Sequence, residues 1–285
     1  MVNTAVFTQA NGLRDVAWAP GGERFVFSDT AGNLGLWERG QMQTVIGAAE
    51  RIAQLAWRPD GQALITVSWD GSAAIWDSAR LTTTAQFAVA DSAVGAQSVA
   101  WSPDGRTLAV GDRAGTVTLW DAQSQAQIRA IPAHTGIVWG LDWDRQSRFV
   151  GSASQDGLVK IWDTQTLAPG DGEVTPAAIL RHESGVNDLA WSHDGTRLAT
   201  ASDDATVQMW DAQSFLPTTT FTGPPGPVKG FWKLSWSPDD LRLAASAADG
   251  SLMVFQTDFD VLLDYVKAQN VPLLSPEQRA MFTGR

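Results

Sequence analysis

The sequence contains no cysteine, only three histidines and no long uninterrupted run of apolar residues. Without cysteine, neither a disulfide framework nor thiol chemistry is available. No stretch approaches the roughly eighteen apolar residues that a membrane-spanning helix needs, and the first residues lack the charged-then-apolar pattern of a secretory leader. We therefore expect a cytoplasmic protein that does not bind membranes.

Positive charge is also scarce. Twenty lysines and arginines stand against 31 aspartates and glutamates, and the formal net charge is −11 at pH 7. Proteins that grip the phosphate backbone of nucleic acids normally present a basic face, so we expect no nucleic-acid partner. This value describes the whole chain and leaves room for a local basic patch.

Tryptophan, by contrast, is abundant, with fourteen copies in 285 residues. Many of them belong to a repeated motif of the type AWSPDG (residues 100–105), in which the first tryptophans are Trp18, Trp57, Trp101, Trp143, Trp191 and Trp236. Each copy is followed by an apolar run, a turn and a second aromatic residue. These closing residues are Trp37, Trp76, Trp120, Trp162, Trp210 and, in the sixth unit, Phe255. The period is close to the roughly 40–45 residues of a four-stranded repeat.

Within each unit the apolar residues alternate with a period of two, which predicts strands. In TVTLWD (residues 116–121), Val117 and Leu119 alternate with threonines and a tryptophan, so both faces are suited to packing. The segment from Pro103 to Gly105 supplies a tight turn, because proline fixes φ and glycine permits positive φ. We expect repeated units that pack face to face.

These motifs resemble the WD-repeat β-propeller family, in a bacterial-type form with degenerate repeats. The resemblance covers approximately residues 3–256 and implies an all-β propeller of four-stranded antiparallel blades, and the six repeated units predict that it is six-bladed. It also implies a buried tetrad in a complete blade, formed by a histidine, a serine or threonine, an aspartate and the closing tryptophan. The fourth and fifth units match this pattern with His134, Ser152, Asp156 and Trp162, and with His182, Thr200, Asp204 and Trp210. The second unit has Thr66, Asp70 and Trp76 but lacks the histidine.

The two ends of the chain bear on how the ring closes. Residues 1–256 are assigned to the propeller, and we expect residues 4–10 to form a strand that completes the sixth blade, since an unpaired edge would favour aggregation. Seven blades are commoner in the family, but no residues remain to build a seventh. Residues 257–285 predict a short helical C-terminal tail, with Val261, Leu262, Tyr265 and Val266 on one face. We expect this tail to pack on a blade or on the bottom rim; the alternative is a docking segment for another domain.

Once the six first-strand and five closing tryptophans are assigned to the core, Trp69, Trp139 and Trp232 remain. The last two stand four residues before a first-strand tryptophan, where the other units have Arg14, Ala53, Gln97 and Asn187. A position that accepts arginine, glutamine and asparagine favours contact with water. Trp69 precedes a hairpin aspartate, at the position of Arg113, Gln155 and Asp203 in other units. By the resemblance, both positions lie at the channel mouth, where such propellers commonly bind partners.

We therefore predict a partner-binding surface and call its members the rim residues. They are Arg14, Arg51, Trp69, Gln97, Arg113, Trp139, Gln155, Asn187, Asp203 and Trp232. The surface would be basic on the first three units and aromatic on the last three, which suits a protein or peptide with an acidic group and an apolar anchor. The alternative is that these tryptophans lean over the channel and bind nothing.

No sequence pattern indicates catalysis. There is no H-E-x-x-H, G-x-S-x-G, phosphate-binding Gly-Lys-Ser/Thr loop or calcium loop, and the residues before the inner strands include no convergent carboxylates. We expect no catalytic residues, no metal and no cofactor. The predicted function is a non-catalytic interaction scaffold or adaptor, monomeric by itself. A sensor or structural module of a larger signalling assembly is the alternative, and a propeller enzyme is a weaker one, since fold does not decide function.

Overall fold

The computed structural model describes residues 12–45, 47, 51–167, 174–223 and 230–257. The strand expected at residues 4–10 and the helical tail expected after residue 257 lie outside the described residues. All regular elements within the described part are β-strands.

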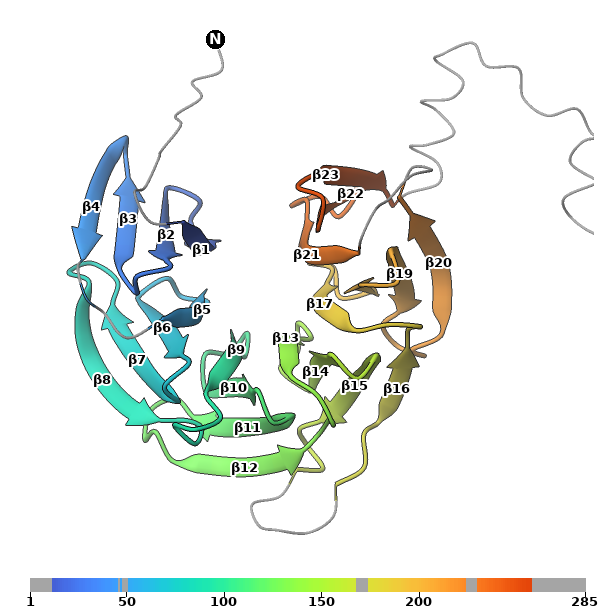
Figure 1. The fold of residues 1–285 in the computed structure, drawn as a ribbon, viewed down its shortest axis with the longest axis horizontal. Coiled ribbons are helices and arrows are strands. Elements are labelled where there is room, and N and C mark those ends of the chain that lie inside the picture. Colours follow the sequence, from blue (N-terminus) through green and yellow to red (C-terminus); the bar gives the residue numbers. More distant parts are fainter. Residues whose placement is uncertain (1–11, 46, 48–50, 168–173, 224–229, 258–285) are drawn as a thin grey trace, which may run out of the picture.

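Six antiparallel sheets stand side by side around a common centre, as the blades of a propeller (Figure 1). Five of them have four strands, and the sixth has three in the described residues. The first three blades consist of β1 (Leu13–Trp18), β2 (Arg24–Asp29), β3 (Leu34–Glu38) and β4 (Gln41–Val45); β5 (Ile52–Trp57), β6 (Ala63–Ser68), β7 (Ser72–Asp77) and β8 (Thr82–Ala88); and β9 (Ala96–Trp101), β10 (Thr107–Asp112), β11 (Thr116–Asp121) and β12 (Gln127–Pro132). The last three consist of β13 (Val138–Trp143), β14 (Phe149–Ser154), β15 (Leu158–Asp163) and β16 (Ala178–Arg181); β17 (Val186–Trp191), β18 (Arg197–Ser202), β19 (Thr206–Asp211) and β20 (Pro217–Thr222); and β21 (Phe231–Trp236), β22 (Arg242–Ala247) and β23 (Leu252–Gln256). The prediction of a six-bladed all-β propeller is confirmed.

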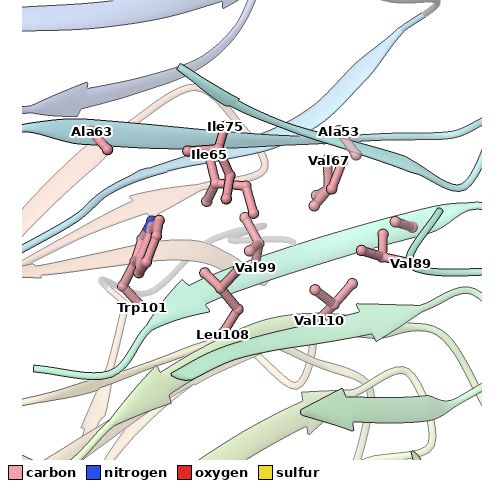
Figure 2. Close-up of a cluster of buried hydrophobic side chains, with 12 residues drawn as sticks. Ala53, Ala63, Ile65, Val67, Ile75, Val89, Val99, Trp101, Leu108 and Val110 are labelled. Carbon is pink, nitrogen blue, oxygen red and sulfur yellow. The ribbon is translucent and has the colours of Figure 1, made fainter. Parts of the chain in front are cut away.

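The hydrophobic core is divided into five clusters, each drawn from two successive blades. Figure 2 shows the one between the second and third blades, where side chains of β6 and β7 meet those of β9 and β10. Ile65 and Val67 on one side and Leu108 and Val110 on the other are nearly inaccessible to solvent. Full burial of one such aliphatic side chain contributes about 1.5–3 kcal/mol, so each blade is stabilised mainly by its neighbours.

The first-strand tryptophans add hydrogen bonds to this packing. The indole Nε1 of Trp57 donates to the carbonyl of Ala17 in the preceding blade at 2.9 Å, and that of Trp236 donates to Ala190 at 3.0 Å. Trp101 and Trp143 donate to the equivalent alanines, both at 3.3 Å. The alanine at this position has no bulky side chain, which lets the indole of the next blade reach its backbone.

Trp18 departs from this rule and from our expectation that it belongs to the core. Its side chain is 57 % exposed, and Leu13 and Val16 of the same strand are exposed to a similar degree. In Figure 1 the first blade faces the sixth across an opening, and β23 of the sixth blade exposes Leu252 and Val254. Among the described residues, the ring contacts of Trp18 are with its own blade, and its ring centre lies 5.0 Å from that of Phe25.

Candidate functional site

The innermost strand of every blade contains a β-bulge at the same place. In the pairing of β1 with β2, for example, Leu13 and Asp15 have partners while Arg14 between them has none. The residues skipped in this way are Arg14, Ala53, Gln97, Trp139, Asn187 and Trp232. A bulge leaves one residue out of the ladder and turns its side chain away from the regular direction of the strand. The repeated position found in the sequence is thus a set of bulge residues at one end of the inner strands.

The hairpin tips after the second strands lie next to these bulges. The backbone N–H of Trp69 donates to the carbonyl of Arg51 at 3.3 Å, and that of Arg113 donates to Gly95 at 3.3 Å. Gly95 has φ of +81°, and a Cβ at this position would collide with the carbonyl of Trp69. The close approach of these two segments fixes the backbone of Trp69 at the rim.

Three arginines from three blades gather around the indole of Trp69. The guanidinium carbons of Arg14, Arg51 and Arg113 lie 4.6, 5.2 and 4.8 Å from the ring centroid. All three are within the roughly 6 Å at which a cation is attracted by the negative face of an aromatic ring. We call these three residues the arginine cluster. The structure therefore brings together four of the rim residues.

The arginine cluster has no counter-charge in direct contact. Among the described residues, no carboxylate oxygen lies within 4.0 Å of any of the three guanidinium groups. Partial burial lowers the pKa of Arg14, Asp15 raises it, and the charges of Arg113 and Arg51 lower it, so that the net shift is downward. The three cations repel one another, although the chain as a whole is acidic.

The remaining rim residues are spread around the ring and differ in exposure. Trp232 is 53 % exposed and Trp139 is half-buried, whereas Gln155 is exposed. Asn187 donates through Nδ2 to Asp203 Oδ1 at 2.7 Å, so these two side chains form a pair. Gln97 is only 7 % exposed, which contradicts the expectation that this bulge position is wet in every blade. Its small accessible surface removes it from any surface a partner could touch.

Deeper in the ring lies a set of polar residues that the sequence did not single out. Asp15 Oδ2 accepts the backbone N–H of Leu55 in the next blade at 2.9 Å, and Gln54 Oε1 accepts that of Val99 at 2.8 Å. These acceptors stand three residues before a first-strand tryptophan. A polar residue recurs at that position in five of the six units, with Ser98, Asp188 and Lys233 as the others, and this was the signal available in the sequence.

Asp15 and Asp188 of this set lie within inner strands, as does Asp142; burial raises the pKa of Asp15 and of Asp142, and the charge of Asp188 raises both further. Burial raises the pKa of Asp188, and Lys233 lowers it, with a net upward shift. Burial also raises the pKa of Asp142 to about 7, against hydrogen bonds from Trp191 and Trp143. Asp188 accepts the N–H of Leu234 at 2.9 Å and Asp142 that of Trp191 at 2.8 Å, so both carboxylates tie one blade to the next.

The two predicted tetrads are joined by hydrogen bonds in the structure. In the fourth blade, Nδ1 of His134 lies 3.0 Å from Asp156 Oδ2, Nε2 lies 2.8 Å from Ser152 Oγ, and Trp162 Nε1 donates to the same hydroxyl at 3.0 Å. In the fifth blade, the corresponding distances for His182, Asp204, Thr200 and Trp210 are 3.0, 2.7 and 2.9 Å. In the second blade, Trp76 Nε1 still donates to Thr66 Oγ1 at 3.1 Å.

The protonation of the tetrad follows from its burial. Burial lowers the pKa of His134, Asp156 raises it in part, and the net shift is downward, so the imidazole is neutral near pH 7. Burial alone would raise the pKa of Asp156, but His134 and backbone N–H groups lower it below its ordinary value. The consistent arrangement has Nδ1–H donating to the ionised carboxylate and Nε2 accepting from the Ser152 hydroxyl. Both histidine nitrogens are thus occupied, which leaves neither free to act on a substrate.

The described residues contain no group of three or more histidine, aspartate or glutamate side chains arranged to hold a metal ion. They also contain no helix with the length and apolar character needed to cross a membrane.

Comparison with known proteins agrees with the architecture. The profile of the family described as "WD domain, G-beta repeat" matches residues 40–77, 87–121, 125–163, 175–211 and 215–256, each of which ends one residue after the closing aromatic residue of a blade. A search of curated proteins found no match to this chain. Five repeat matches, covering well over half of the sequence, together with six radially arranged sheets, show that the chain belongs to the WD-repeat family of β-propellers.

Proposed function

We propose that this propeller is a non-catalytic interaction scaffold that binds a protein or peptide at the rim residues other than Gln97. WD-repeat propellers commonly serve as such scaffolds. The observation that carries the proposal here is the arginine cluster on Trp69, in which three cations from separate blades meet without a carboxylate in contact. Arginine and tryptophan are the residue types most enriched among those that dominate binding energy.

The two halves of the ring would bind different parts of the partner. The arginine cluster belongs to the first three blades, whereas Trp139 and Trp232 extend from β13 and β21 in the other half (Figure 1). The exposed indole of Trp232 offers an apolar contact with a polar edge. A peptide with an acidic group at one end and an apolar side chain at the other suits this arrangement.

The histidines and buried carboxylates that a propeller enzyme could use are engaged in structural hydrogen bonds. Both tetrad histidines, His134 and His182, are fully engaged by their hydrogen bonds. The third, His193, bonds through Nδ1 to Asp240 at 2.8 Å. The carboxylates of Asp15, Asp142 and Asp188 each accept a backbone N–H of the following blade. These engagements favour binding over catalysis.

The experiment is affinity capture from a lysate of the source cells. The wild-type protein is compared with Trp139→Ala/Trp232→Ala and with a control, Ile179→Ala/Leu216→Ala. The control removes two other exposed apolar side chains, 44 % and 64 % exposed, that lie away from the rim. All three proteins must have matched melting temperatures.

We expect a protein that the wild type and the control retain and the double tryptophan variant loses. Identical captured sets from all three proteins would place binding elsewhere and contradict the proposal. Capture of no protein by the wild type would also contradict it.

A further inference from the structure

We propose that the arginine cluster binds the dianionic phosphoryl group of a phosphorylated side chain in the protein partner. This inference rests on the proposed function, because it assigns a chemical class to the acidic anchor at the rim residues.

The positive charge of the arginine cluster is not balanced by an ion pair with a neighbouring carboxylate of the described residues. Any two of the three guanidinium carbons are within about 10 Å of each other, because all three lie close to one indole, and charges within a Debye length interact through solvent. Folding brings these like charges together at a cost, although the chain carries an excess of acidic residues that could have neutralised them. An arrangement of this kind is stabilised when an anion binds.

The neighbouring carboxylates are occupied by other bonds. Asp15 accepts the N–H of Val16 at 3.0 Å and that of Leu55 at 2.9 Å. Asp70, next to Trp69, accepts from the N–H and the hydroxyl of Ser72, at 2.9 and 2.6 Å. These carboxylates are held by their own strands and turns and make no ion pair with the cluster. The anion must therefore come from outside the described chain.

The arginine cluster also has many hydrogen-bond donors that are free to bind a ligand. Each guanidinium has five N–H donors in a fixed plane. None of these donors in Arg14, Arg51 or Arg113 makes a hydrogen bond to a described residue, whereas Arg24, for example, donates three to Gly61 and Ser78. A carboxylate has two oxygens and one negative charge. A phosphoryl group has three terminal oxygens and nearly two charges, and it can accept from all three arginines at once.

The indole of Trp69 holds the three arginines in place. A guanidinium stacked on an aromatic ring keeps its N–H edges free, so the ring holds the arginines without consuming their donors. The indole is itself held firmly, since Trp69 packs against the core between the second and third blades and Gly95 runs directly against its backbone. Side chains held in this way lose less conformational entropy on binding than free arginines would.

The test uses three peptide libraries that differ only at one fixed central residue: phosphoserine, serine or glutamate. Binding of each library is measured by fluorescence anisotropy for the wild type, for Arg51→Gln/Arg113→Gln, and for the control Arg39→Gln/Arg80→Gln. The control removes the same charge from exposed arginines on outer hairpins. Inorganic phosphate alone is titrated as a separate probe.

We expect the phosphoserine library to bind the wild type and the control at least tenfold more tightly than either other library, and the cluster variant to lose this preference. Equal binding of the phosphoserine and glutamate libraries, or an unchanged preference in the cluster variant, would overturn the proposal. Inorganic phosphate that binds as tightly as the phosphoserine library would overturn the assignment to a phosphorylated protein.

Phosphatase treatment of the lysate separates this inference from the proposed function. Loss of the captured partner after treatment supports the phosphoryl ligand. A partner that still depends on Trp139 and Trp232 but is captured equally well after treatment would leave the scaffold standing and remove the phosphate site.

Discussion

The hydroxyl oxygen of Ser152 in β14 lies 2.8 Å from Nε2 of His134, which stands in the connection between β12 of the third blade and β13 of the fourth. The same oxygen accepts the indole N–H of Trp162 at 3.0 Å, so one hydroxyl links two ring systems where water has no access. A buried network of this kind is stabilising only while every member has a partner. Its integrity therefore governs the stability of the blade.

Truncation of Trp162 should destabilise the protein far more than truncation of Trp139. Trp162 is 2 % exposed, and Trp162→Ala leaves a large cavity and removes one of the hydrogen bonds of the Ser152 hydroxyl, which we expect to lower the free energy of unfolding by about 3–5 kcal/mol. Trp139 is half-buried at a bulge, and we expect a much smaller loss for Trp139→Ala. Urea denaturation followed by circular dichroism measures both. Equal losses would show that Trp139 belongs to the core.

Trp18 should tolerate substitution better than its counterparts in other blades. It is 57 % exposed, whereas Trp101 is 7 % exposed and donates to Ala56 of the preceding blade. We expect Trp101→Ala to cost about 3–5 kcal/mol and Trp18→Ala about 1 kcal/mol or less. Melting temperatures of the two variants test this. A similar loss for both would mean that another part of the protein covers Trp18.

Acid should weaken the fold through the tetrad histidines. The pKa of His134 is lowered in the folded protein by burial, so between this value and about 6.5 the unfolded chain binds the extra proton. The free energy of unfolding contributed by this group falls as pH drops below about 6.5, by at most about 1.4 kcal/mol per pH unit. His134→Gln should be less stable at pH 7.5 but should lose less stability between pH 7 and 5. An identical pH dependence in the variant would contradict this assignment.

Asp142 should change the pH dependence of the free energy of unfolding in the opposite direction to His134. Burial raises its pKa to about 7 from an ordinary value of 3.8, so between these values the folded protein holds the extra proton. Its contribution to the free energy of unfolding grows as pH falls from about 7 toward 4 and is lost as pH rises through 7. Asp142→Asn cannot titrate, so the stability of the wild type relative to this variant should increase from pH 8 to pH 5. A difference that stays constant with pH would refute the raised pKa.

Gly95 should be sensitive to a single added methyl group. Its φ is +81°, and the new Cβ would collide with the carbonyl of Trp69. Gly40 is the matched control, because its φ is +82° and a Cβ there meets nothing within 4 Å. We expect Gly40→Ala to lose about 1 kcal/mol from the left-handed backbone alone, and Gly95→Ala to lose clearly more. Thermal unfolding compares the two, and equal losses would exclude the steric contact.

The fold was largely predictable because its signals are local. The repeated tryptophans, the turn at Pro103–Gly105 and the alternation in residues 116–121 act over a few residues, and they specify strands and hairpins wherever they occur. The two tetrads could be assigned from spacing combined with family resemblance, since His134 and Asp156 stand at fixed places in a repeated unit. Six copies of such a unit leave few arrangements that bury both faces of each sheet.

Details of the site were harder to foresee because they depend on relations between blades. Gln97 and Trp232 occupy the same bulge position, but one is buried and the other exposed, since the surroundings of each bulge come from neighbouring loops. The exposure of Trp18 follows from its place beside the opening, which its own motif does not encode. The carboxylate acceptors such as Asp15 find their partners in the next blade along the ring.

By itself, the sequence determined the repeat, the strand pattern, the number of blades and the types of residue at the bulge positions. Tertiary structure alone decided that Arg14, Arg51 and Arg113 meet on a single indole. These residues come from three blades and are separated by 37 and 62 positions, so no local pattern relates them. Their convergence depends on the radial packing of the blades, which brings the bulge residue Arg14, Arg51 before β5 and Arg113 after β10 to one aromatic ring.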